Sequence, residues 1–151
     1  MSNILKANIT DIDEILDLQY LAFQTEADML GTRAIPALKQ QYDDVLRDFN
    51  NGLMLKMISS TGRIIGSVRA FANDDYVSIG KLMVHPDHRR KGYAAKLLRE
   101  VEKYYPDKRL ELYTCSRSLL NIALYESVGY KQYKTVPGPD NLDMTYLEKC
   151  C

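Results

Sequence analysis

A basic segment that contains glycine, residues 84–94 (VHPDHRRKGYA), has the composition of an anion-binding turn. It follows the strand-like run 76–84 and leads directly into an amphipathic, helix-like run. Backbone N–H groups at a helix N-terminus lack partners and carry partial positive charge, so they accept an anion without a dedicated side chain. Gly92 lets the backbone come close to that anion. Three cationic side chains stand just before it: Arg89, Arg90 and Lys91. The segment therefore predicts a pocket for the phosphate groups of a cofactor.

The elements that must position this turn alternate between strand-like and helix-like patterns. Strands are expected near residues 4–9, 53–58, 63–72, 76–84, 109–115, 130–136 and 142–148. Helices are expected over residues 10–23 and 36–49, from the basic turn to residue 105, and over 118–128. Residues 26–35 contain Gly31 and stop at Pro36, so they are expected to form a loop. The pattern predicts a single α/β domain over residues 1–151, with one mixed sheet flanked by helices.

Composition narrows the classes of function. A chain of 151 residues fits one domain, and its 46% apolar and 26% charged content is ordinary for a globular protein. The 20 basic and 20 acidic residues balance, so the overall charge favours neither nucleic acid nor a membrane surface as partner. No apolar run approaches the roughly 20 residues that a membrane span needs. Any anion site must therefore be local.

The cysteines favour a reducing compartment. Three are present, two of them adjacent as Cys150 and Cys151, and this number does not make a disulfide framework. Cys115 lies in an apolar run and is expected to be a small core residue. No N-terminal segment resembles a signal peptide, so the expected location is the cytoplasm.

Two motifs occur in order along the chain. In residues 89–94 (RRKGYA), an arginine is followed by glycine after two residues, and by alanine after one more. About thirty residues later, 121–130 (NIALYESVGY) combine an asparagine, a tyrosine four residues on, and a closing Gly-Tyr pair. Both motifs, each on its expected element, resemble the GNAT superfamily of acyl-CoA-dependent N-acetyltransferases. Ala123 stands one place earlier than the commonest spacing of that family.

The resemblance implies a fold, a donor and a reaction. The fold would be a mixed, mostly antiparallel twisted sheet of about six or seven strands with about four helices. The donor would be acetyl-CoA, and the acetyl group would pass directly, in a ternary complex, to a primary amine of a small molecule or peptide. The resemblance implies a monomer or homodimer, no metal, and cofactor contacts by Leu82, Met83, Val84, Arg89, Arg90, Lys91, Gly92, Tyr93, Ala94, Asn121 and Tyr125.

Tyr125 is the candidate general acid. It lies one helical turn after Asn121, so both side chains can face the same slot. A phenol with an ordinary pKa near ~10 stays protonated at pH 7 and can donate a proton to a departing thiolate. By analogy with the family, a backbone amide near residues 82–84 would hold the thioester carbonyl, where a fixed donor stabilises developing charge.

The general base is left open by the sequence. Several well-known members of the superfamily place a glutamate or a pair of histidines on the strand before the turn, where this chain has Ser78 and Gly80, which are not bases near neutral pH. Proton removal would then use water or a carboxylate elsewhere. The two candidates are Glu26, in the expected loop after the first helix, and Glu111, on the strand beside the expected cofactor cleft.

The sequence bears on two alternatives to an acetyltransferase, a metal site and a sensor without turnover. His85 and His88 with Asp87 lack a third well-spaced ligand, and phosphate binding already accounts for the turn, so no metal is expected. The second alternative is an acyl-CoA-binding sensor or regulatory module of the same fold without turnover, which the missing strand carboxylate favours. Tyr125 favours the enzyme.

Overall fold

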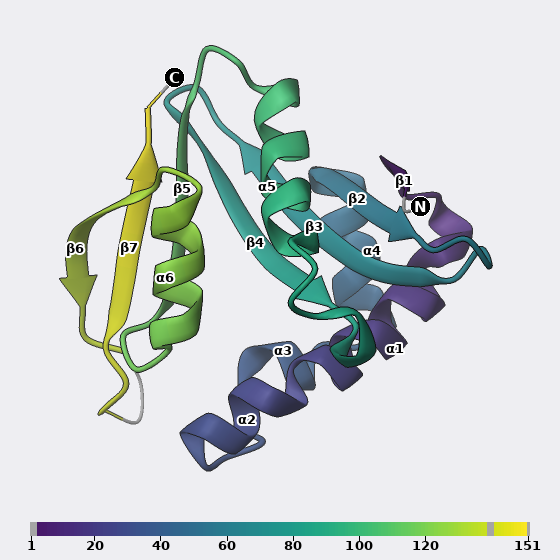
Figure 1. The fold of residues 1–151 in the computed structure, drawn as a ribbon, viewed down its shortest axis with the longest axis horizontal. Coiled ribbons are helices and arrows are strands. Elements are labelled where there is room, and N and C mark those ends of the chain that lie inside the picture. Colours follow the sequence, from purple (N-terminus) through teal and green to yellow (C-terminus); the bar gives the residue numbers. More distant parts are fainter. Residues whose placement is uncertain (1–2, 139–140, 151) are drawn as a thin grey trace.

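Seven strands form one twisted sheet in the order β1-β2-β3-β4-β5-β7-β6 in the computed structural model, which describes residues 3–138 and 141–150 (Figure 1). The strands are β1 (Asn3–Lys6), β2 (Leu53–Ile58), β3 (Ile64–Ala72), β4 (Tyr76–Val84), β5 (Arg109–Cys115), β6 (Lys131–Val136) and β7 (Met144–Lys149). Neighbouring strands pair antiparallel except β4 and β5, which are parallel. The mixed, mostly antiparallel sheet predicted from the sequence is confirmed. Cys151 lies outside the described residues.

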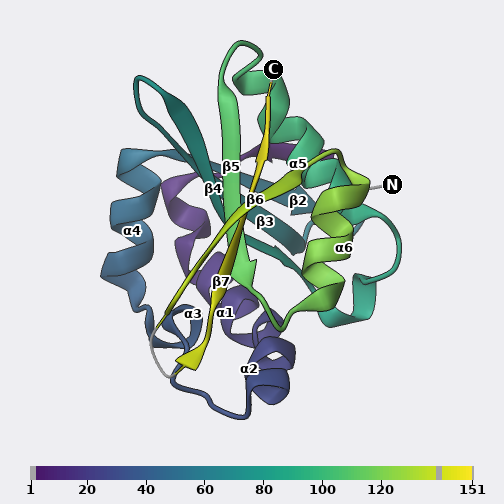
Figure 2. The same cartoon turned by 90° about the vertical axis from the view of Figure 1, so that its left-hand side faces the viewer.

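Helices cover the sheet on both faces, as the turned view also shows (Figure 2). They are α1 (Ile12–Ala22), α2 (Gln24–Leu30), α3 (Pro36–Lys39), α4 (Tyr42–Asn51), α5 (Tyr93–Tyr104) and α6 (Leu119–Ser127), with single 3-10 turns at Ile9–Asp11 and Pro86–His88. None of the helices in the described part of the chain is long and apolar enough to cross a membrane.

Two hydrophobic clusters hold these layers together. The larger lies under α5 and α6 and includes Leu97, Val101 and Leu112. The smaller lies under α1 and α4 and includes Ile15 and Val45. Because successive residues of a strand point to opposite faces, strand β3 supplies side chains to both clusters and is buried over most of its length.

Two of the expected elements were wrong, and both corrections bear on the site. Residues 26–35 were expected to form a loop, but helix α2 runs to Leu30 and ends at Gly31, whose φ of +74° makes it a left-handed helix cap. The expected helix over 36–49 is split into α3 and α4, because Gln40 is extended (φ −63°, ψ 141°). The Tyr20 hydroxyl donates to the Gln40 carbonyl, which holds the chain in that conformation.

Strands β4 and β5 separate along their length. They pair only from Tyr76–Ser78 of β4 to Arg109–Glu111 of β5, although β4 continues to Val84. Between the β3 partners Ser67 and Arg69, which are two residues apart, β4 advances three residues, from Gly80 to Met83. This extra residue is a β-bulge, a feature that bends a strand and re-aims its side chains. The C-terminal half of β4 thus leaves its parallel neighbour and opens one side of the sheet.

Candidate active site

A cavity of about 670 Å³ lies where β4 and β5 have separated. Its walls are the end of β4, the basic turn, the first turns of α5 and α6, and the junction of α1 with α2. The predicted cofactor residues that line it are Leu82, Met83, Val84, Arg89, Arg90, Gly92, Tyr93, Ala94, Asn121 and Tyr125. Lys91 is the one predicted cofactor residue that is not part of the lining. The two motifs therefore face a single space.

The basic turn has the backbone of an anion cradle. Gly92 is the residue that caps α5, and its φ of +76° lies in the left-handed region. Arg90 also has a positive φ, of 64°, which is uncommon for a residue with a side chain. Such a turn aims consecutive N–H groups at one point, and the helix dipole of α5 adds positive potential there. A Cβ atom at Gly92 would meet nothing within 4 Å, so the space beside it is open.

The guanidinium of Arg89 makes two hydrogen bonds that were not predicted from the sequence. Its Nη1 donates to Thr25 Oγ1 at 2.7 Å, and its Nη2 donates to the Ala22 carbonyl at 2.8 Å. Arg89 therefore fastens the basic turn to the start of α2. Arg90 is exposed and makes no hydrogen bond to any residue in the described ranges, so its guanidinium is the more available one for a phosphate.

The start of α6 supplies one amide and an apolar rim. Asn121 Nδ2 donates to Thr114 Oγ1 of β5 at 3.3 Å, which leaves the carbonyl oxygen of the Asn121 side chain for a ligand. Leu119 and Leu120, also in the cavity wall, are 73% and 86% exposed. Exposed neighbouring leucines at a cavity mouth indicate contact with an apolar part of a ligand.

Tyr125 and Glu26 face the same cavity from α6 and α2. Tyr125 is only 8% exposed, and its pKa is raised above the ordinary value by burial and by the nearby charge of Glu26. Burial also raises the pKa of Glu26, while the cation of Lys81 acts in the opposite direction. Tyr125, which keeps its proton at neutral pH, thus lies near Glu26, whose carboxylate binds a proton more readily than an exposed one.

Glu111, the other base candidate, is not brought to the cavity. It lies on β5 where that strand still pairs with β4, opposite Ser78. Its carboxylate forms an ion pair with Arg109 at 3.1 Å and accepts a hydrogen bond from the Tyr133 hydroxyl. Both partners lie outside the cavity lining, as Glu111 itself does.

No group of three or more histidine, cysteine, aspartate or glutamate side chains within residues 3–138 and 141–150 is arranged to hold a metal ion. His85 Nδ1 accepts from the backbone N–H of Asp87 at 3.0 Å, and the rings of His85 and His88 meet edge to face. These contacts give the two histidines structural partners. Cys115, expected in the core, is buried.

The cavity wall also contains residues that were not predicted from the sequence. Ala22, Phe23, Thr25 and Met29 come from the end of α1 and from α2. Arg117, in the loop before α6, reaches across to the Met29 carbonyl at a long 3.5 Å. Of residues 26–35, expected to form a loop, Glu26 was selected from the sequence but Met29 was not.

Together, the separated strands, the turn capped by Gly92 and the buried Tyr125 define an α/β protein in which both sequence motifs line one cavity. Residues 12–130 match the family model described as the acetyltransferase (GNAT) family. The chain therefore belongs to the GNAT family of acetyltransferases.

Comparisons with individual proteins agree with this membership. The chain is 29% identical, over 130 residues, to the UPF0157 protein YqkA of Bacillus subtilis (strain 168). The match covers 85% of this chain but only 37% of YqkA, so the chain spans little more than a third of that relative. Its fold is similar to that of the ribosomal-protein-S18-alanine N-acetyltransferase of Escherichia coli, with a TM-score of 0.80, 18% identity, and coverage of 99% and 94% of the two chains. It is also similar to the PaiA N-acetyltransferase of Thermoplasma acidophilum, solved with coenzyme A, with a TM-score of 0.81, 16% identity, and coverage of 100% and 99%.

Proposed function

We propose that this protein is an N-acetyltransferase that moves the acetyl group of acetyl-CoA to a primary amine by direct transfer within a ternary complex. The observation that carries the proposal is that both halves of the site, the anion cradle capped by Gly92 and the buried Tyr125, line one cavity. In support, the PaiA structure that shares this fold contains coenzyme A. The donor is thus proposed to lie with its pyrophosphate against the cradle.

Chain residues can hold the donor in order from one end to the other. The backbone around Gly92 and the side chain of Arg90 would contact the pyrophosphate. The free carbonyl of Asn121 and the backbone of 82–84 would contact the pantetheine arm and the thioester. Leu119 and Leu120 would cover its apolar stretches. In the structure, Arg89 serves instead to place α2 against this cradle.

Proton transfer is proposed to involve two residues. The amine nitrogen attacks the thioester carbon, the carbon–sulfur bond breaks, and Glu26 accepts the proton that the nitrogen loses. Tyr125 donates a proton to the departing thiolate. Because burial raises the pKa of both groups, Tyr125 stays protonated at neutral pH and Glu26 is a stronger base than an exposed glutamate.

The test is a screen of amines for acetyl-CoA-dependent thiol release, followed by Tyr125→Phe assayed with the best acceptor. We expect Tyr125→Phe to lower kcat by about 10²-fold or more while the affinity for acetyl-CoA is kept, which is the usual range for loss of a general acid. Tyr104→Phe, at an exposed position on α5, is the matched control and should be unchanged. Tight acetyl-CoA binding with no thiol release from any amine would favour a sensor over an enzyme.

We also propose that residues 1–151 act as one domain in the cytoplasm. The support is that the described strands form a single sheet, and that three cysteines are too few for a disulfide framework.

A further inference from the structure

Lys81 lies at the bulge of β4 and has no partner of its own. Its φ is +50°, an uncommon value for a residue with a side chain, and its side chain is partly buried. Its ammonium group makes no hydrogen bond, and no ion pair within 4.0 Å, to any residue that the structure describes. A lysine held in a strained backbone and partly withdrawn from water, with no carboxylate in ion-pair contact, is an unusual arrangement that points to a ligand.

The charges around Lys81 come from three other elements. Arg69 of β3 and Asp48 of α4 form an ion pair of 3.0 Å, and Glu26 lies on α2. Burial and the charge of Arg69 lower the pKa of Lys81, and Asp48 and Glu26 only offset this. Asp48 is already paired with Arg69, and Glu26 acts on Lys81 without forming an ion pair with it.

Open space lies directly beside this lysine. Gly80 is paired with Arg69, and residues directly opposite each other in an antiparallel pair face the same side of the sheet. A Cβ atom added at Gly80 would meet nothing within 4 Å. The α1–α4 side of the sheet is therefore open at Gly80, next to Lys81, and the charge of Lys81 also acts on Glu26.

We propose that the acceptor is an amino acid with a free carboxylate, which Lys81 binds while Glu26 faces the amine. This inference rests on the proposed N-acetyltransferase function and names its substrate class. An amino acid carries its amine and carboxylate two bonds apart, so it matches a site in which a carboxylate and an ammonium group are near enough to influence each other. The carboxylate supplies the anion that Lys81 lacks, and the amine is directed to the proton acceptor.

The experiment compares matched acceptors: L-amino acids, their carboxamides, and the corresponding decarboxylated amines. Thiol release is measured with wild-type protein and with Lys81→Met, which removes the charge but keeps the side-chain length. We expect wild type to favour the free acids in kcat/KM by roughly tenfold or more, as for loss of a charge-assisted hydrogen bond. Lys81→Met should abolish this preference by raising KM for the acids, with KM for acetyl-CoA unchanged. Lys103→Met, on the exposed face of α5, is the control.

A second variant tests the location. The φ of Gly80 is not in the left-handed region, so Gly80→Val can be accommodated by the strand, but its side chain would occupy the open space. It should raise KM for the amino acid and leave acetyl-CoA affinity unchanged. Equal use of acids and carboxamides by wild type, a preference that persists in Lys81→Met, or an unchanged KM in Gly80→Val would each overturn this inference and leave the proposed function standing. If no amine of any kind is acetylated, the proposed function itself fails, and the inference with it.

Discussion

Arg89 Nη1 donates a 2.7 Å hydrogen bond to Thr25 Oγ1, and this contact joins the basic turn to the helix that carries Glu26. A second hydrogen bond, from Arg89 Nη2 to the Ala22 carbonyl, holds the same junction at 2.8 Å. The Arg89 side chain therefore fixes two walls of the cavity relative to each other. One is the wall proposed to hold the donor, and the other is the wall proposed to accept the proton. Changes on either wall should affect the other.

The first prediction separates the two arginines of the turn. Arg89→Ala should lower the free energy of unfolding by about 1 to 3 kcal/mol, because two hydrogen bonds from a charged donor are lost. Arg90→Ala should leave the unfolding free energy unchanged and weaken coenzyme A binding, more so at low salt, because this guanidinium is exposed and has no partner among the described residues. Urea denaturation and calorimetric titration measure the two effects. Equal losses of stability in both variants would contradict this division of roles.

Arg89 also shows where sequence reasoning reached its limit. Its place in the 89–94 motif correctly located the turn and the cavity, since local spacing and strand-to-helix order determine both. The actual partners of Arg89 lie more than sixty residues earlier, at the junction of α1 with α2, and most of α2 was expected to be a loop. Likewise, the bulge that sets Lys81 apart depends on pairing with β3 and leaves no local signature. Features created by contacts between distant segments were the ones missed.

The second prediction concerns Gly92, the left-handed cap of α5. Gly92→Asp and Gly92→Asn place side chains of nearly equal size there, and both residue types tolerate left-handed backbone and cap helices well. Both variants should therefore fold. The aspartate should also repel the pyrophosphate, so coenzyme A affinity should fall at least roughly tenfold further in Gly92→Asp than in Gly92→Asn. Matching affinities by calorimetry would place the anion elsewhere.

The third prediction is the pH dependence of activity through Glu26. The carboxylate must be ionised to accept a proton, and burial raises its pKa above the ordinary 4.5. Activity should therefore decline as the pH falls through this raised pKa. Glu26→Gln should lower kcat and remove this acidic limb from the profile of kcat/KM. A wild-type limb that survives in Glu26→Gln would assign the base to another group or to water.

Glu26 should also leave a mark on stability, which provides an independent control. The pKa of Glu26 is higher in the folded than in the unfolded chain, so the folded state binds a proton at Glu26 more tightly. The free energy of unfolding therefore falls as the pH rises through the folded pKa. Glu26→Gln should thus raise the free energy of unfolding at pH 7. This gain in the free energy of unfolding should shrink as the pH falls, and it should disappear below the pKa that Glu26 has in the unfolded chain. A less active variant that is also less stable at pH 7 would indicate disruption of α2 instead.

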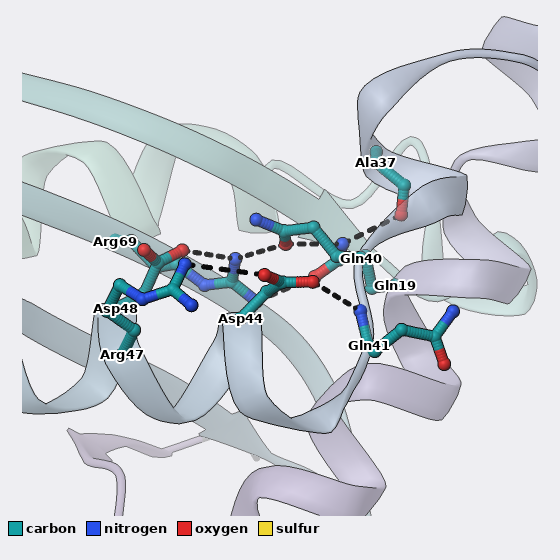
Figure 3. Close-up of polar contacts among 8 residues, drawn as sticks. All are labelled: Gln19, Ala37, Gln40, Gln41, Asp44, Arg47, Asp48 and Arg69. Carbon is teal, nitrogen blue, oxygen red and sulfur yellow. Dashed lines mark hydrogen bonds and ion pairs between the residues drawn. The ribbon is translucent and has the colours of Figure 1, made fainter.

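The last prediction concerns the buried charge of Arg69, whose polar contacts with Gln19, Gln40 and Asp48 are drawn in Figure 3. Arg69 is fully buried, and its guanidinium donates to Asp48 at 3.0 Å, to Gln40 at 3.0 Å and to Gln19 at 2.6 Å. The Asp48 side chain is 26% exposed. Removing Asp48 therefore leaves the buried Arg69 cation without its carboxylate, whereas removing Arg69 leaves an Asp48 anion that can reach water.

Asp48→Ala should accordingly lower the free energy of unfolding by about 3 kcal/mol, whereas Asp43→Ala, exposed on the same helix, should change it little. Adding Arg69→Met to Asp48→Ala should recover part of the loss, because the uncompensated charge is then gone. Urea denaturation of the single and double variants gives the coupling between the two residues. If the second substitution only adds to the destabilisation of the first, packing by Arg69 matters more than its charge, and Asp48 is not needed to neutralise it.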